Sequence, residues 1–130
     1  YETVGKLFIL LVREIEPELR KINLYPGQEI FLGIIAKKEG ITLVQLADLT
    51  KRTKATITNS IKSLEKAGYV EKRNSKTDKR KQEIYLTEEG RKVNKKVKKI
   101  IEKIYLKMDS KLETKEREVL ENIVEKLSTQ

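Results

Sequence analysis

The segment from 53 to 68, TKATITNSIKSLEKAG, carries side chains whose types and spacing are suited to binding another molecule. At 100° per residue, a helix would gather its apolar residues on one side and short polar or basic side chains on the other. This second face consists of Ala55, Asn59, Lys62 and Lys66. It fits the major groove of DNA, where an amide pairs with adenine and an ammonium group with guanine or phosphate. A solvated helix of a lysine-rich protein would look the same, so both interpretations stay open.

A second basic cluster lies in the segment from 74 to 81, NSKTDKRK. Its cations are Lys76, Lys79, Arg80 and Lys81. Like charges this close repel one another unless something anionic relieves them. By a charge-assisted bond, Asp78 could hold Arg80 or Arg73 in one rotamer, ready for a phosphate or a minor groove. The alternative is that Asp78 is a turn residue in a solvated loop.

The charge of the chain is concentrated around these two segments. The formal net charge is +9, and residues 51 to 81 alone hold eleven Lys/Arg against three Asp/Glu, a net charge of +8. Residues 1 to 50 come to −1 and residues 82 to 130 to +2. Such a concentration indicates an acidic partner. Nucleic acid is favoured over a membrane surface because no apolar run is long enough to insert.

The composition argues against several classes of function. With no Cys and no His, the chain cannot form disulfides or thiolate metal sites, and it lacks the commonest neutral-pH acid and base. We therefore expect no enzyme, no cofactor and no metal site. A hydrolase built on carboxylates such as Glu65 or Glu71 remains an alternative, although nothing in the sequence pairs them. No signal peptide or membrane span is visible, so we expect a cytoplasmic protein.

The elements that must position these side chains begin with two helices. Apolar residues at helical spacing from 3 to 22 predict a first helix, in which Pro17 should cause a kink or a break. Pro26 suits the first position of a second helix, and Gly40 should follow its end.

The central region predicts a helix-turn-helix followed by a hairpin. Thr42 and Gln45 form a capping box for a short helix, whose buried side should be Leu43, Leu46, Ala47 and Leu49. Thr53 can cap the next helix, and Gly68 can end it in a left-handed conformation. The alternating runs 69 to 73 and 82 to 86 then predict a β-hairpin with a basic tip.

Two further helices complete the chain, the first capped by Thr87 and the second starting at Thr114. The second should bury Val119, Leu120, Ile123, Val124 and Leu127. The apolar stripes of the first and last two helices are more than a chain with 38% apolar residues can bury alone, which predicts a homodimer. A monomeric helical bundle is the alternative.

The segment DKRKQEIYLTEEGR (78 to 91) resembles MarR-type transcriptional regulators, which show Asp-x-Arg, a strand, and then Leu-Thr-x-x-Gly-Arg. Leu64, Gly68 and Val70 match the family's Leu-x-x-x-Gly-x-Val pattern. The resemblance implies an obligate dimer with recognition helices in successive major grooves, Arg80 in a minor groove and Asp78 as its positioning partner. Ser75 departs from the family, because many members have a second Asp there, and Asn59 stands where many have Arg.

Together these observations predict a mainly α protein with a small β-hairpin wing. One domain, 1–130, would contain a winged helix-turn-helix at about 26–90 and dimerisation helices at about 2–23 and 91–128. We expect a sequence-specific regulator of transcription, a repressor that binds double-stranded DNA as a homodimer on a palindromic operator. A structural or RNA-binding winged helix is the alternative.

The predicted contacts fall into three groups and one crevice. The base-reading residues are Thr56, Thr58, Asn59 and Lys62; the residues on the DNA backbone are Lys51, Arg52, Thr53 and Lys54; the wing residues are Lys76, Asp78, Lys79, Arg80 and Lys81. Tyr25 and Phe31 could border the crevice where members of the family bind aromatic acids, or could simply be core. A small aromatic or anionic effector is the corresponding expectation.

Overall fold

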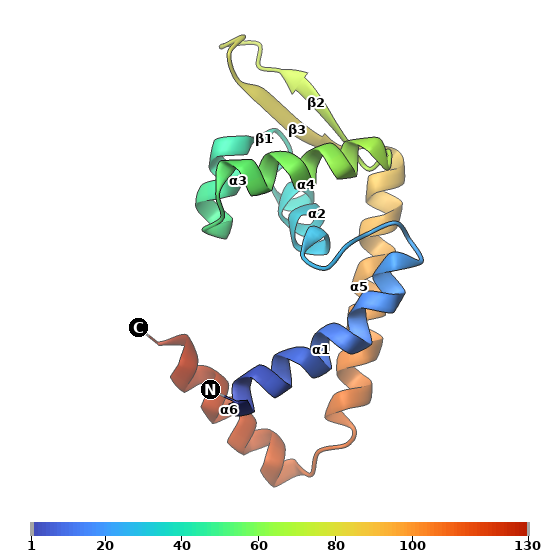
Figure 1. The fold of residues 1–130 in the computed structure, drawn as a ribbon, viewed down its shortest axis with the longest axis vertical. Coiled ribbons are helices and arrows are strands. Elements are labelled where there is room, and N and C mark those ends of the chain that lie inside the picture. Colours follow the sequence, from blue (N-terminus) through green and yellow to red (C-terminus); the bar gives the residue numbers. More distant parts are fainter. Residues whose placement is uncertain (1, 130) are drawn as a thin grey trace.

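The computed structural model describes residues 2–129, which form six helices and three short strands. In chain order these are α1 (Glu2–Arg20), α2 (Gln28–Lys37), β1 (Ile41–Thr42), α3 (Leu43–Thr50), α4 (Lys54–Lys66), β2 (Val70–Asn74), β3 (Gln82–Leu86), α5 (Glu88–Asp109) and α6 (Thr114–Ser128). The sheet and α2 to α4 gather at one end of the molecule, and α5 runs from there to the other end, where α6 lies (Figure 1). The predicted fold class, a winged helix-turn-helix with flanking helices, is confirmed.

The hydrophobic core lies at the winged-helix end. Every element there contributes to it: Phe31, Leu32 and Ile35 from α2, Ile41 from β1, Leu46 from α3, Ile57, Ile61 and Leu64 from α4, Val70 from β2, Ile84 and Leu86 from β3, and Val93 and Val97 from α5. Leu19 at the end of α1 is fully buried in the same cluster. This shared core fixes α4 and the hairpin relative to each other, which a binding surface built from both elements requires.

The sheet is antiparallel with the order β1-β3-β2. β2 and β3 form the predicted hairpin, with Val70 opposite Leu86 and Asn74 opposite Gln82. The sequence did not predict β1, a two-residue strand in which Ile41 pairs with Ile84. It is short because Thr42 is also the N-cap of α3, and an N-cap has the extended backbone of a strand residue.

The predicted helix starts and stops are confirmed where they depend on local chemistry. Thr42 and Gln45 form the capping box, in which the Thr42 amide donates to Gln45 Oε1 at 3.0 Å. Thr53 and Thr87 cap α4 and α5 by accepting the amides three residues on, Thr56 and Gly90. Gly68 follows α4 with a φ of +83°, the left-handed conformation that the sequence required.

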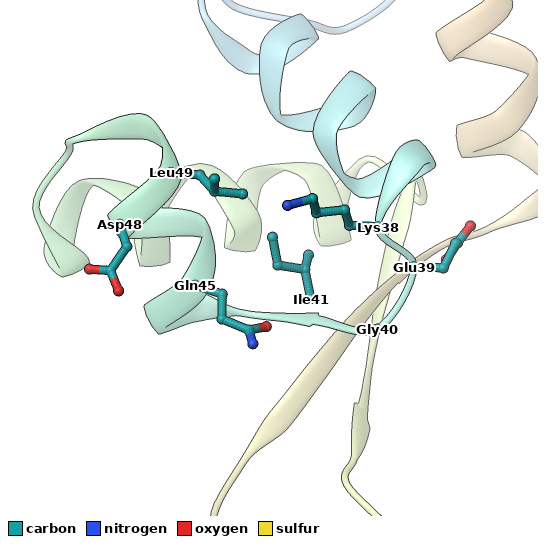
Figure 2. Close-up of a pocket in the computed structure, with 7 residues that line it drawn as sticks. All are labelled: Lys38, Glu39, Gly40, Ile41, Gln45, Asp48 and Leu49. Carbon is teal, nitrogen blue, oxygen red and sulfur yellow. The ribbon is translucent and has the colours of Figure 1, made fainter.

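Three details differ from the prediction. Of the kink or break expected at Pro17, the break does not occur, because one proline removes only one bond from the ladder. α2 starts at Gln28 instead of Pro26, since Gly27 takes a left-handed backbone as its N-cap. Leu49 is 50% exposed instead of buried. In Figure 2 its side chain lies beside those of Ile41 and Lys38 over an open cavity of about 420 Å³.

The start of α5 packs directly on the backbone that links α4 to the hairpin. The Thr87 amide donates to the Tyr69 carbonyl at 3.0 Å, and the Thr87 hydroxyl donates to the Gly68 carbonyl at 2.6 Å. A Cβ on Gly90 would lie 1.9 Å from the Tyr69 carbonyl oxygen, so no larger residue fits without moving the helix. This contact gives a physical reason for the glycine of the Leu-Thr-x-x-Gly-Arg motif.

The far ends of α1, α5 and α6 expose large apolar side chains. They are Val4, Leu7, Phe8, Ile9 and Leu10 on α1, Tyr105 and Leu106 on α5, and Val119, Ile123, Val124 and Leu127 on α6. None of the residues of α6 is buried within the chain, so the burial expected for its apolar stripe would need a second subunit. We call these side chains the terminal apolar face. Within residues 2–129, no helix is both long and apolar enough to cross a membrane.

Candidate nucleic-acid interface

The outward face of α4 is the first part of the candidate interface. Ile57, Ile61 and Leu64 point into the core, each no more than 1% exposed. On the opposite side, Asn59 and Lys62 are exposed together with Ala55, Thr56 and Lys66. Thr58 is only half-buried and lies at the edge of this face. The helix therefore presents Asn59 at the centre of an exposed polar and basic surface, as its spacing predicts.

Side chains at the start of α4 divide between two surroundings. Lys51, Thr53 and Lys54 are exposed beside the first turn of the helix. The Thr56 hydroxyl lies 2.9 Å from the Thr53 hydroxyl, so it belongs to the cap as well as to the exposed face. The guanidinium carbon of Arg52 lies 5.6 Å from the ring centroid of Phe31, beside α2. This position gives no support to a backbone contact by Arg52.

The wing, formed by β2, β3 and the connection 75–81, ends in a tight hydrogen-bonded turn. The Ser75 amide donates to the Lys81 carbonyl at 2.9 Å, and the buried Ser75 hydroxyl accepts from the amides of Thr77 and Asp78. Asp78 Oδ1 accepts from the backbone amide of Arg80 at 3.0 Å. The carboxylate thus shapes the backbone of the tip, and the predicted bond to an arginine side chain is not formed.

Arg73, near the tip end of β2, is held by other groups. Its guanidinium pairs with Glu71 and stacks 4.3 Å from the ring centroid of Tyr85. The hydrogen bond with Glu71 is the main cause that raises the pKa of Arg73. Burial, followed by the hydrogen bond to Glu83, raises the pKa of Tyr85. Arg73 is therefore occupied on the hairpin surface and is not a partner of Asp78.

The wing tip and the start of α4 border one cavity, which we call the wing cavity. Its volume is about 420 Å³. It is lined by Thr42, Leu43, Val44, Gln45, Lys54, Asn74, Lys79, Arg80, Lys81 and Gln82. Two of the predicted groups, the backbone-contacting residues and the wing residues, therefore meet at one place through Lys54 and the last three wing cations. Lys76 does not line this cavity.

Comparison with known proteins decides the family. The model described as MarR family matches residues 26–81. A solved structure of a MarR protein from Peptoclostridium difficile is 30% identical, with a TM-score of 0.83 over 98% of this chain and 83% of that chain. The chain belongs to the MarR family.

Other comparisons found a curated transcriptional regulator and a further solved structure of the same fold. An uncharacterised HTH-type transcriptional regulator of Bacillus subtilis, YybA, is 32% identical over 76 residues, 58% of this chain and 51% of that protein. The chain thus spans about half the length of the curated relatives it matches. Streptococcus pneumoniae FabT, solved in complex with DNA, has the same fold, with a TM-score of 0.84 at 23% identity over 97% of this chain and 90% of that chain.

The MarR chain also has a crevice where the terminal helices meet the winged helix. We call this cavity, about 290 Å³, the hinge crevice; it is lined by Phe8, Leu11, Val12, Ile15, Glu16, Pro26, Gly27, Glu29, Ile30, Arg52 and Tyr105. Neither aromatic residue that the sequence suggested belongs to the lining. Phe31 is core, 1% exposed, and Tyr25 is 57% exposed.

Sequence reasoning missed several residues of both cavities in this MarR protein. The amides of Gln45, Asn74 and Gln82 join the wing cavity only because β1 brings the start of α3 against β3. Tyr105 reaches the hinge crevice from α5, far along the chain from the other lining residues. No local sequence pattern predicts either contact, because both depend on how the helices and strands pack.

Proposed function

We propose that this MarR protein regulates transcription as a homodimer that binds double-stranded DNA in a sequence-specific manner, most simply as a repressor on a palindromic operator. The observation that carries the proposal is the exposed face of α4, with Asn59 at its centre, beside a wing of exposed cations. In the FabT structure, a protein of this fold is in complex with DNA. A cytoplasmic location goes with this function. Family membership gives no support to the alternative of a carboxylate hydrolase.

The assembly that we propose places two winged helices on one DNA. The terminal apolar face supports a dimer, because eleven large apolar side chains on three helices are unlike the surface of a stable monomer. A symmetric dimer presents its two recognition helices to successive major grooves about 34 Å apart. Arg80, exposed at the tip of each wing, would then enter the flanking minor groove.

One experiment tests the DNA-binding function directly. Fluorescence titrations would compare duplex fragments that co-purify from cell extract, random duplex DNA and random RNA at several salt concentrations. We expect the co-purified duplexes to bind at least about a thousandfold more tightly than random duplex at physiological salt. Equal binding to all three nucleic acids would favour the alternative, a structural or RNA-binding winged helix without operator specificity.

Asn59→Ala is expected to change which sequence is preferred more than it changes binding to random DNA. The Asn59 amide can pair with both edge atoms of adenine, which is worth about 1–3 kcal/mol of discrimination. Lys62→Ala is the contrast, because an ammonium group that also meets phosphate should weaken all duplexes more evenly. Selection from randomised sites measures both variants. An unaltered preferred sequence with Asn59→Ala would exclude base reading by this residue.

We propose the hinge crevice as the site of a small aromatic or anionic effector. Its apolar lining suits an aromatic ring, and Arg52 supplies a cation. The two carboxylates of the lining are already engaged, Glu16 with Arg20 and Glu29 with the Gly27 amide. Within residues 2–129, by contrast, Arg52 forms no ion pair.

The effector prediction uses benzoate and simple substituted benzoates as probes. Calorimetric titration of the wild type is expected to show saturable binding, and Arg52→Gln should weaken it about tenfold or more because a charge-assisted bond is lost. Lys51→Gln is the matched control, since the neighbouring Lys51 does not line the crevice. Equal affinities for wild type and Arg52→Gln would rule out an anion site at this position.

A further inference from the structure

The wing cavity combines an unusual set of lining groups. Four cations reach it from two separate elements, Lys54 from the start of α4 and Lys79, Arg80 and Lys81 from the wing. The remaining polar groups are three amides and one hydroxyl, and no carboxylate contributes to the lining. In the capping box, Gln45 Oε1 accepts from the Thr42 amide, which leaves the side-chain nitrogen of Gln45 to donate elsewhere.

No ion pair within residues 2–129 neutralises the four cations of the wing cavity. The ion pairs that do form engage cations of α1, β2 and α5 and Lys21 just after α1, and none includes Lys54, Lys79, Arg80 or Lys81. Two carboxylates lie near the lining, and both have other partners: Asp78 accepts the Arg80 amide, and Glu83, opposite Thr42 in the sheet, accepts from the Tyr85 hydroxyl. Four positive charges around one hollow raise its electrostatic potential, and a small anion would relieve their repulsion.

We propose that the wing cavity is a discrete phosphate site that takes one phosphate group of the DNA backbone and holds it between α4 and the wing. The inference rests on the proposed function. It adds that one phosphate of the DNA is bound by both α4 and the wing. Phosphate contacts fix the register of a protein on DNA. The shared core already fixes the strands of the wing, so a phosphate bound jointly by Lys54 and the wing lysines would fix the tip, residues 75–81, relative to α4. Arg80 borders the same cavity and is exposed, and in this proposal it enters the minor groove while Lys54 and the wing lysines hold the phosphate.

The test uses inorganic phosphate as the probe, without DNA. Isotope-labelled full-length protein is titrated with phosphate while chloride keeps the ionic strength constant, and amide resonances are followed by NMR. We expect the resonances of Val44, Gln45, Lys54 and Lys81 to shift together and to saturate with one dissociation constant. Lys54→Gln is expected to weaken this binding about fivefold or more, as the loss of one charge-assisted contact implies. Lys76→Gln, an exposed wing lysine outside the cavity, should bind within about twofold of the wild type.

A second arm measures DNA binding by the same variants. Lys54→Gln should reduce the slope of log affinity against log salt by about one per subunit. Lys54→Gln combined with Lys79→Gln should lose less affinity than the product of the two single losses, because both residues hold one anion. For Lys54→Gln combined with Lys76→Gln, the loss of affinity should equal the product of the two single losses, because Lys76 lies outside the cavity.

The outcomes separate this site from the general function. Small, unsaturated shifts at every lysine-bearing segment, with intact DNA binding, would overturn the phosphate site and leave the DNA-binding function standing. Independent effects of Lys54→Gln and Lys79→Gln would also overturn it. If the wild-type protein bound no DNA, the proposed function would be overturned. The phosphate titration would still decide whether the cavity binds the anion.

Discussion

Ile123→Asp is expected to separate the two subunits and to abolish tight DNA binding with them. Ile123 belongs to the terminal apolar face and is 46% exposed in the single chain, so the substitution leaves the core of the protomer intact. In a symmetric dimer the interface would receive two carboxylates, each in apolar surroundings. We expect the dimer to lose about 3–5 kcal/mol, which raises its dissociation constant by roughly two to four orders of magnitude.

Sedimentation and fluorescence titration would measure the two losses, which should track each other. The matched control is Asn122→Asp, which introduces the same charge one residue away, on the polar side of α6. It should remain dimeric and bind DNA normally. A wild-type protein that sediments as one chain of 15.1 kDa at micromolar concentration would contradict the dimer, and so would an unchanged dimer with Ile123→Asp.

Arg80→Ala is expected to weaken operator binding by about 1–3 kcal/mol per half-site, and by about twice that for the dimer. Folding should change by no more than about 0.5 kcal/mol, because Arg80 is exposed at the tip of the wing. The loss should be largest on operators with narrow, A/T-rich flanks. Fluorescence titration against one operator at several salt concentrations measures it. Wild-type affinity would show that the wing is a solvated loop.

Arg80→Lys separates groove reading from simple charge. A purely electrostatic wing tolerates lysine, whereas a guanidinium in a minor groove loses its planar shape and weaker hydration when lysine replaces it. We therefore expect Arg80→Lys to recover only a small part of the loss. Full recovery would assign Arg80 to phosphate contacts alone.

Substitutions of Asp78 test how the tip is shaped. Because Asp78 Oδ1 accepts the Arg80 amide, Asp78→Ala should weaken binding through Arg80, and its combination with Arg80→Ala should lose less than the sum of the two. Asp78→Asn keeps an oxygen that can accept the same bond, so we expect operator affinity at or above that of the wild type. If Asp78→Asn lost as much operator affinity as Asp78→Ala, the negative charge of Asp78 would matter more than its hydrogen bond in the turn.

The sequence was informative wherever the relevant physics is local. Thr42, Thr53 and Thr87 each sit within three residues of the amide they cap, and the helical spacing of Ile57 and Ile61 alone decides which face of α4 is buried. The interface face follows from that burial. Local rules therefore predicted the recognition helix, its caps and the hairpin.

Long-range packing explains what the sequence could not predict. Arg52 was expected on the DNA backbone because it lies beside Lys51 and Lys54, yet it turns to the ring of Phe31, which lies on another helix. Asp78 was expected to bind an arginine side chain, but a backbone amide two residues away lies closer along the turn. In both cases, residues that are neighbours in the sequence face different surroundings. Only the folded structure shows which surroundings each side chain faces.

In the proposed dimer, the length of α5 has a consequence for the distance between the two winged helices. This helix has 22 residues and joins the winged helix to the terminal apolar face as one continuous rod (Figure 1). At 1.5 Å per residue it is about 33 Å long, so a tilt of about 10° at one end sweeps the other through an arc of about 6 Å. Tyr105, near the far end of the rod, lines the hinge crevice. A molecule bound in this crevice would touch both α5 and the winged helix, and a 10° tilt that it caused would move the winged helix by about the width of a minor groove, about 6 Å.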